Sequence, residues 1–372
     1  MSIDLEKMPK LGFGLMRLPV KDGVIDIDRT SDMVDRYMSK GLNYFDTAYM
    51  YHEGNSEKAI KEALVKRYPR ESYMLTTKLP VWMLDGPEDK DKVFEEQLRR
   101  TGVEYFDFYL MHSIEDGNYQ KYNDYKCFEW AMEKKKQGKI KHLGFSFHGT
   151  PELMERVLDE HPEVEFAQIQ LNYADWNSKR VQSGRLYQIL SSRNIPIIVM
   201  EPVKGGTLAN VEPELEAMFK SARPDKSVAS WALRFVASLK GVMTILSGMS
   251  TEEQMEDNLA TFTDFEPLNE KEQRVVQEVV KKMLGMPTIP CTACRYCTEG
   301  CPMQISIPDV FKAVNTMSMH PDTDEGQNIY NELIKNTGKA SDCIGCGQCE
   351  RVCPQHLAII ELLKEASEKL ES

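Results

Sequence analysis

Apolar runs alternate with amphipathic segments along the first 265 residues, and this alternation constrains the fold more than any other feature. Runs typical of strands lie near Leu11–Leu15, Asn43–Thr47, Tyr73–Lys78, Phe106–Met111, Ile140–Phe145, Glu165–Gln170, Ile195–Met200 and Val242–Leu246. Segments with apolar residues at helical spacing follow them at Arg29–Ser39, Ser56–Arg67, Asp89–Arg100, Lys126–Gln137, Pro151–Asp159, Arg180–Ser191, Ser227–Leu239 and Thr251–Thr261. Eight such alternations in about 250 residues predict an α/β fold of the (β/α)₈ TIM-barrel type.

A doubly wound open sheet is the competing architecture. It would carry a three-glycine fingerprint after its first strand, whereas the segment Gly12 to Arg17 reads Gly-Phe-Gly-Leu-Met-Arg and lacks the third glycine. The barrel is therefore favoured over residues 1–265. A charged helical segment over 266–290, ending in Gly285, Pro287 and Pro290, reads as a linker to a third region, 291–372.

Composition narrows the function classes. A net charge of −12 argues against nucleic acid or an anionic membrane as the main partner. No apolar run approaches the roughly 20 residues of a membrane span, and the amino-terminal residues have no signal-peptide core. A cytoplasmic location is therefore expected, and there nine cysteines are better explained as metal ligands than as disulfides.

Eight of the nine cysteines form two runs of the same spacing, C-x₂-C-x₂-C-x₃-C, and each run is followed by a proline, Pro302 or Pro354. This spacing is the signature of two-cluster ferredoxins, in which the fourth cysteine of each run serves the other cluster. One [4Fe–4S] cluster is thus assigned to Cys291, Cys294, Cys297 and Cys353, and the second to Cys343, Cys346, Cys349 and Cys301. Structural zinc sites, the alternative, usually combine paired C-x₂-C units rather than triplets.

The cysteine-rich region is predicted to be small and mainly helical. Val310–Met317 and Ile329–Lys335 have helical patterns, and the region resembles the all-helical dicluster ferredoxin modules. Pro302 and Pro354 are each expected to open a helix, where a missing N–H costs nothing. Cys127, the ninth cysteine, stands in a helix-like stretch and is expected to be a buried small side chain.

Polar side chains stand where three successive strands of the barrel are expected to end. Asp46, Lys78 and His112 follow apolar runs, and Tyr51 comes five residues after Asp46 in a loop. In TIM-barrel enzymes the catalytic groups lie at the carboxyl ends of the barrel strands. A phenol titrates near pH ~10, so it acts as a proton donor at neutral pH only with a cation beside it, for which Lys78 is the candidate.

The barrel motifs resemble those of the aldo-keto reductases over roughly residues 9 to 262. The segments that carry the resemblance, in order along the chain, are Phe45-Asp46-Thr47-Ala48 with Tyr51, Thr77-Lys78, Leu110-Met111-His112, Gly144-Phe145-Ser146, Gln168-Ile169-Gln170 and Ser247-Gly248-Met249-Ser250. The whole chain is similar to the bacterial branch of that family whose barrel carries a carboxy-terminal dicluster ferredoxin domain.

The resemblance implies an NAD(P)H-dependent reduction of an aldehyde or ketone. Tyr51 would be the general acid, Lys78 would lower its pKa, and Asp46 would hold Lys78 charged, while hydride would come from the nicotinamide. His112 would orient and polarise the carbonyl. Relatives that reduce carbon–carbon double bonds can carry a glutamate at that position, so the histidine favours carbonyl chemistry.

The resemblance also implies a set of cofactor contacts. Ser146 and Gln168 match the pair that holds the nicotinamide carboxamide, although Phe147 replaces the asparagine that normally follows the serine. Met200 stands where many relatives stack an aromatic ring on the nicotinamide. Lys204 and Gly205 follow the seventh strand, where the pyrophosphate should run.

The adenosine end would lie after the eighth strand, from Ser247 to Asn258, and Asn258 matches the adenine contact of the family. Gly248 and Gln254 occupy the positions of the lysine and arginine that take the 2′-phosphate of NADP. Without these two cations the 2′-phosphate loses its usual partners, so either NADP or NAD could be the cofactor. The substrate mouth would carry aromatic residues that could equally pack the loops, namely Trp82, Tyr119, Tyr122 and Trp176.

The clusters need their own explanation, because hydride transfer requires no iron–sulfur centre. They could be structural or sensing elements beside a carbonyl reductase. Alternatively, the chain could be an electron-transfer reductase that exchanges single electrons with a ferredoxin or flavin carrier. A third reading, a non-catalytic barrel that senses nucleotide redox state, has no need for Tyr51 and Lys78 together.

Overall fold

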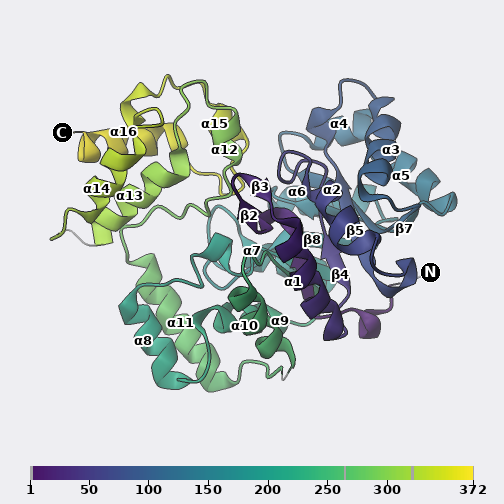
Figure 1. The fold of residues 1–372 in the computed structure, drawn as a ribbon, viewed down its shortest axis with the longest axis horizontal. Helices are drawn as coiled ribbons and strands as arrows, with labels where there is room; N and C mark the ends of the chain where they lie inside the picture. Colours follow the sequence, from purple (N-terminus) through teal and green to yellow (C-terminus); the bar gives the residue numbers. More distant parts are fainter. Residues whose placement is uncertain (1–2, 264, 320–321, 372) are drawn as a thin grey trace.

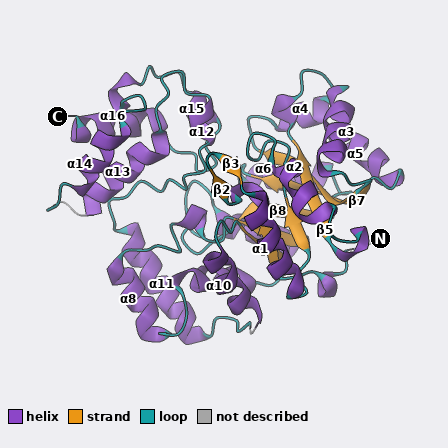
Figure 2. Ribbon diagram, viewed as in Figure 1, coloured by secondary structure: helices purple, strands orange, loops and turns teal. Residues whose placement is uncertain are grey.

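The computed structural model of the chain describes residues 3–263, 265–319 and 322–371. Eight parallel strands close into a barrel in the order β1-β10-β9-β8-β7-β6-β5-β4. Their bounds are β1 Leu11–Gly14, β4 Tyr44–Asp46, β5 Met74–Leu79, β6 Phe106–Ile114, β7 Ile140–Phe147, β8 Phe166–Gln170, β9 Ile197–Met200 and β10 Val242–Ser247. The predicted TIM barrel is confirmed, and Figures 1 and 2 show its strands enclosed by helices.

Helices follow the strands as the periodicity predicts. They are α1 Ile27–Ser39, α2 Ser56–Ile60 with a π-helical turn at Lys61–Val65, α3 Asp89–Thr101, α5 Cys127–Lys136, α6 Pro151–Glu160, α7 Ser183–Ser192, α9 Val228–Ala237 and α10 Glu252–Thr263. Side chains at their starts satisfy free N–H groups: Asp26 caps α1, Thr150 caps α6 and Ser227 caps α9.

The interior of the barrel is filled rather than open. Tyr44, Phe108, Leu110, Phe166 and Ile198 form a buried apolar cluster inside it, so chemistry is confined to the mouth. The sequence patterns missed three further elements of the barrel region, the antiparallel hairpin β2 Val20–Lys21 with β3 Val24–Ile25, and the helices α4 Tyr119–Asp124 and α8 Pro213–Ala222.

The segment expected as a linker contains the helix α11, Glu270–Leu284, which starts at a capping box formed by Asn269 and Glu272. Its apolar face packs on α8, where Val276 and Val279 share a buried cluster with Leu215 and Phe219. The division into barrel, linker and cluster domain stays a prediction.

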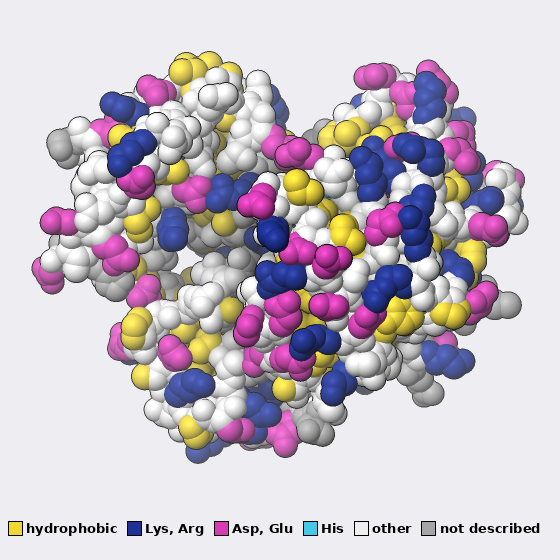
Figure 3. All heavy atoms as spheres, viewed as in Figure 1, with side chains coloured by type: hydrophobic (Ala, Val, Ile, Leu, Met, Phe, Trp, Pro, Cys, Tyr) yellow, Lys and Arg dark blue, Asp and Glu magenta, His cyan; other side chains and the backbone are white. Residues whose placement is uncertain are grey.

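The C-terminal region is helical, with α12 Tyr296–Glu299, α13 Ile307–Met319, α14 Glu325–Leu333, α15 Gln348–Arg351 and α16 Ile359–Leu370. Val310, Phe311, Tyr330 and Leu363 lie in its separate apolar core. Figure 1 shows this region beside the barrel, and residues of both line one cavity at the barrel mouth. Figure 3 shows basic and acidic side chains interspersed over this face, with a hollow between the C-terminal helices and the helices below them.

The expectation that Pro302 and Pro354 each open a helix is wrong, because α13 and α16 begin five residues later. Both prolines lie in turns: the amide of Gln304 donates to the carbonyl of Cys301, and that of His356 donates to Cys353, each at 3.0 Å. Proline at the second position of a turn pre-sets its φ angle, and this requirement outweighs the preference for a helix start.

Candidate active site

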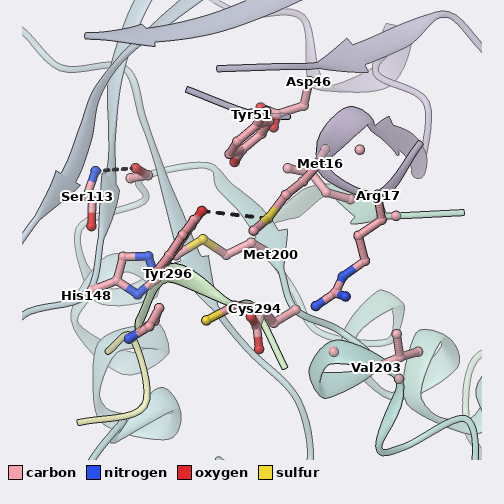
Figure 4. Close-up of a pocket in the computed structure, with 18 of the residues that line it drawn as sticks. Met16, Arg17, Asp46, Tyr51, Ser113, His148, Met200, Val203, Cys294 and Tyr296 are labelled. Atoms are coloured by element: carbon pink, nitrogen blue, oxygen red, sulfur yellow. Dashed lines mark hydrogen bonds between the residues drawn. The ribbon is translucent and has the colours of Figure 1, made fainter. Parts of the chain in front are cut away.

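A cavity of about 900 Å³ lies at the carboxyl ends of the barrel strands. Its walls come from both regions of the chain, since Asp46, Tyr51 and His112 line it together with Cys294 and Tyr296. Figure 4 shows Tyr51 of the barrel and Tyr296 of the C-terminal region among the side chains that line it. A pocket of this size accommodates a cofactor and a small substrate.

The structure brings the four predicted catalytic residues together. Lys78 is fully buried, and its Nζ lies 2.6 Å from Asp46 Oδ2, 2.7 Å from the carbonyl of Thr47 and 3.4 Å from Tyr51 Oη. The ring centroids of Tyr51 and His112 are 6.1 Å apart. One ammonium thus connects a carboxylate to a phenol at the floor of the cavity.

A second layer holds Lys78 in place from below. Gln97 donates to the carbonyl of Lys78 at 2.8 Å, and Thr77 donates to the buried carboxyl of Glu57 at 2.8 Å. Arg100 lies 3.4 Å from the other oxygen of Glu57. Burial nevertheless raises the pKa of Glu57 to about 7, so a partly exposed arginine does not fully offset the desolvation of this carboxyl.

Tyr51 is positioned by a strained turn. His52 and Glu53 have positive φ angles of 51° and 55°, and Gly54 follows at 81°. The carbonyl of Tyr51 accepts hydrogen bonds from the amides of Gly54 and Ser56. His52 Nε2 accepts from the amide of Leu18 at 3.2 Å, which ties this turn to the loop after β1. Strain of this kind persists where surrounding contacts over-determine the backbone.

The pKa of Tyr51 departs from the sequence expectation. Burial and the nearby carboxylates of Asp46 and Glu201 raise this pKa well above its ordinary value, rather than leaving it lowered by Lys78. Asp46 neutralises much of the charge that Lys78 presents to the phenol. Tyr51 therefore holds its proton firmly until a strong base reaches it.

His112 is neutral at physiological pH, since burial and then the charge of Lys78 lower its pKa well below the usual value. It lies within β6 rather than after it, beside a register shift and the positive φ of Ser113. Tyr122 donates to its carbonyl at 2.5 Å, and the ring of Trp82 lies 5.1 Å from the imidazole. Its Nδ1 is buried without a hydrogen-bond partner among the described residues.

The candidates for nicotinamide contact line the same cavity. Gln168 donates through Nε2 to the sulfur of Met200 at 3.5 Å, while its Oε1 is buried without a partner in the described part of the chain. Ser146 accepts from the amide of Ser113 at 2.6 Å. The unpartnered carbonyl oxygen of Gln168 can accept from the amide of a nicotinamide, and the polarizable thioether of Met200 can cover its flat ring.

Lys204, one of the residues expected at the pyrophosphate, is directed elsewhere. Its Nζ lies 2.5 Å from Asp175 Oδ1 and 3.1 Å from Gln355 Oε1, inside the contact with the C-terminal region. Gly205 lines the cavity, and a Cβ there would approach the carbonyl oxygen of Thr292 to 2.1 Å. Lys204 thus does not face the cavity as the sequence predicted, because the C-terminal region supplies a partner that the barrel motifs could not reveal.

The adenosine candidates, Ser247, Gln254 and Asn258, also line the cavity. Asn258 is buried and donates to Ser247 Oγ at 2.8 Å. Gln254 folds back, so that its Oε1 accepts from the amide of Ser250 at 2.8 Å. Of the loop aromatics, Trp82 lines the cavity, Tyr119 and Tyr122 are buried outside its lining, and Trp176 packs against the barrel core.

Four cysteines from both runs line one small cavity in the C-terminal region. They are Cys291, Cys294, Cys297 and Cys353, the set assigned to one cluster, and Ile307, Phe311 and Ile359 surround them. Burial raises the pKa of the Cys294 thiol to about 11, so thiolates here require a bound cation such as cluster iron. The residues therefore fit an iron–sulfur cluster.

The second set divides between two segments. Cys349 is buried, Cys343 is partly buried and Cys346 is exposed. Cys301 follows α12, which packs against α15. Exposure of Cys346 gives this set a more solvent-facing environment than the first.

The C-terminal region is anchored on the mouth of the barrel. Gln355 is buried and donates to Gln170 Oε1 at 3.1 Å, and His356 Nε2 lies 2.9 Å from the carbonyl of His148. Tyr296 donates to the sulfur of Met16 at 3.7 Å, as Figure 4 shows. These contacts place Cys294 and Cys297 in the wall of the barrel cavity.

Glu201 is a cavity residue that the sequence patterns missed. It follows β9 with a positive φ of 54°, and its Oε2 is buried without a partner among the described residues. Burial raises its pKa to about 7. The sequence did contain a signal for Glu201. It directly follows the strand that ends at Met200, and polar residues at the ends of other barrel strands line the same cavity.

The fold and the site define an oxidoreductase barrel, and the chain belongs to the aldo/keto reductase family. The model of the Aldo/keto reductase family matches residues 10–281. A second model, the 4Fe-4S dicluster domain, matches residues 290–358. None of the helices that the structure describes is long and apolar enough to cross a membrane.

Relatives share the barrel. The chain is 26% identical to an L-galactose dehydrogenase of Arabidopsis thaliana over 291 residues, covering 73% of this chain and 90% of that protein. Among solved structures, the holo form of an aldo-keto reductase from Bacillus halodurans matches with a TM-score of 0.59 at 22% identity, covering 73% of this chain and 92% of the other. An aldo-keto reductase from Klebsiella pneumoniae in complex with NADPH matches equally well, with 0.59 at 21% identity, covering 73% and 91%.

Proposed function

We propose that the chain reduces an aldehyde or ketone to an alcohol at the expense of NADPH or NADH. The observation that carries this proposal is the contact of Lys78 Nζ with Asp46 at 2.6 Å and with Tyr51 at 3.4 Å on the floor of a cavity large enough for a nicotinamide and a small substrate. Gln168 and Met200 beside it are the proposed nicotinamide contacts.

Each residue has a distinct part in this reaction. The nicotinamide, when bound, supplies hydride to the carbonyl carbon. Tyr51 protonates the carbonyl oxygen, which becomes strongly basic as hydride arrives, so a phenol of raised pKa still transfers its proton. Lys78 stabilises the phenolate that remains, and neutral His112 orients the oxygen as a hydrogen-bond donor.

Both nucleotides have support among relatives. The Klebsiella protein was solved with NADPH, and an Escherichia coli relative is an NADH-specific methylglyoxal reductase, 24% identical over 304 residues. The substrate is proposed only as a small carbonyl compound. We also propose a cytoplasmic location, where two thiolate-bound clusters are protected from oxidation.

Tyr51→Phe tests the function with a matched control in the same cavity. We expect this variant to lose NAD(P)H-linked reduction of a panel of aldehydes by about 10²-fold or more, because the phenylalanine has no proton to give. Tyr296→Phe removes the other phenol that lines the cavity and should retain turnover. Turnover by the Tyr51 variant at the wild-type rate would refute the proposed role.

A second candidate function follows from a different observation. The cluster ligands Cys294 and Cys297 line the cavity, so a cluster would stand beside whatever binds there. Single-electron exchange with a ferredoxin or flavin carrier is the corresponding activity. Under anaerobic conditions it predicts bleaching of the cluster absorbance by a reduced carrier, NADH or substrate, and it fails if the clusters stay oxidised with all three.

A further inference from the structure

The cavity is short of positive charge. Among the described residues that line it, Arg17 and Arg351 are the only lysines or arginines. Five carboxyl groups line the same cavity, on Asp46, Glu115, Glu201, Asp257 and Glu299. A dinucleotide brings a negatively charged pyrophosphate, which prefers a guanidinium or ammonium partner.

The lysine expected for this purpose is committed elsewhere. Lys204 is 5% exposed and holds Asp175 and Gln355 in a buried network. Withdrawing one member of a buried ion pair is strongly unfavourable, because it leaves an uncompensated charge in the interior. Lys204 therefore stays in the contact with the C-terminal region, and the phosphate needs another cation.

Arg17 stands where that cation is required. It ends the short helical turn after β1, and Figure 4 shows its guanidinium extended into the cavity toward Val203 and Cys294. Ser250 donates to its carbonyl at 2.7 Å, which fixes its backbone to the loop after β10. Its side chain lies over Gly248, where a Cβ would come within 3.3 Å of it.

Gly248 leaves space for the side chain of Arg17. Any larger residue at position 248 would crowd that side chain, because its Cβ would come within 3.3 Å of the Cβ of Arg17.

The guanidinium is only partly used. Its Nη2 donates to the carbonyl of Thr292 at 3.1 Å, and within the described ranges it makes no ion pair. A guanidinium has five N–H donors, so most remain free. A phosphate carries a negative charge that the Thr292 carbonyl lacks and can accept two parallel bonds from the guanidinium, so a phosphate would compete successfully with Thr292.

We propose that Arg17 is the residue that binds a phosphate group of the dinucleotide. The inference rests on the proposed function, since it names how the cavity would hold NADH or NADPH. The phosphate is either the pyrophosphate, common to both nucleotides, or the 2′-phosphate of NADPH. Thr292 follows the cluster ligand Cys291, so the same guanidinium joins the nucleotide site to the cysteine loop.

The test is a binding titration of NADH and NADPH to the anaerobically purified full chain. Arg17→Gln is compared with wild type and with Arg17→Lys, while folding and cluster content are followed by circular dichroism and visible absorbance. Arg274→Gln, in an exposed arginine of α11, is the matched control for loss of a positive charge.

We expect Arg17→Gln to weaken binding by about 10- to 100-fold, as for loss of a hydrogen bond between charged groups. Equal losses for both nucleotides identify the pyrophosphate, and a loss confined to NADPH identifies the 2′-phosphate. Arg17→Lys should lie between, and Arg274→Gln should bind as wild type does.

Unchanged binding by folded Arg17→Gln would overturn the assignment alone and leave the proposed function standing. An equal loss in the Arg274 control would also overturn it, since the effect would then be one of overall charge. A larger loss in Arg351→Gln, at the other cavity arginine, would transfer the site to the C-terminal region. If the wild-type chain bound neither nucleotide, the proposed function would fail together with this inference.

Discussion

Replacing Asp46 by asparagine removes the carboxylate that keeps Lys78 charged. Burial lowers the pKa of Lys78, and the Asp46 carboxylate is the first of the influences that raise it again. At the observed 2.6 Å, the attraction between the two groups is about 6 kcal/mol for an effective dielectric constant of about 20. Without that attraction, burial lowers the pKa of Lys78 further.

The Asp46→Asn variant should therefore have a Lys78 whose pKa is lower than in wild type. A group with a lowered pKa is charged only below that pKa, so activity that needs the ammonium should fall as pH rises. Wild type, with the carboxylate in place, should show no such fall over the same range. Asp46→Glu, which keeps the negative charge, is the matched control.

The assay is kcat/KM for a reactive aldehyde between about pH 5 and 9, with the fold of each variant checked by circular dichroism. A profile for Asp46→Asn that runs parallel to wild type would refute the reasoning. It would show that the carboxylate does not set the charge of Lys78, whatever the absolute loss of rate.

Two further predictions concern stability and the clusters. Glu57 has a pKa of about 7 in the fold against 4.5 for a free carboxyl, so wild type should lose up to about 3 kcal/mol of unfolding free energy as pH rises from 4.5 to 7. In denaturant titrations, the unfolding free energy of Glu57→Gln should depend less on pH over this range. The same pH dependence as wild type would contradict the raised pKa of Glu57. Cys353→Ser, although in the second cysteine run, should remove the cluster of the first run and about half of the iron, leaving the signal of the more exposed cluster. Cys346→Ser should do the converse, and identical spectra from both variants would contradict the crossed ligand assignment.

The barrel was predictable because its strands and helices repeat a local pattern. The strands are short apolar runs, and Asp46 stands at the end of β4 and Lys78 next to the end of β5, so these two residues could be placed on one rim before any contact was known. The spacing of the cysteines similarly predicted which four would share a cavity, and the structure brings Cys353 to Cys291, Cys294 and Cys297.

Contacts between the two regions could not be predicted from local patterns. Nothing near Lys204 indicates that Gln355, 151 residues away, takes part of its hydrogen-bonding capacity. The raised pKa of Tyr51 likewise depends on burial and on Glu201, which no motif included. The turns at Pro302 and Pro354 were missed because proline suits both a helix start and a turn.

The most direct test of the account follows the hydrogen that reaches the substrate. An aldehyde is reduced in ordinary water with NADPH or NADH that carries deuterium at both C4 positions, and the alcohol is analysed by mass spectrometry and NMR. Direct hydride transfer at the Tyr51 site predicts one deuterium on the carbinol carbon of every product molecule. Hydrogen from solvent at that carbon would contradict it, and would indicate electrons delivered one at a time through the clusters.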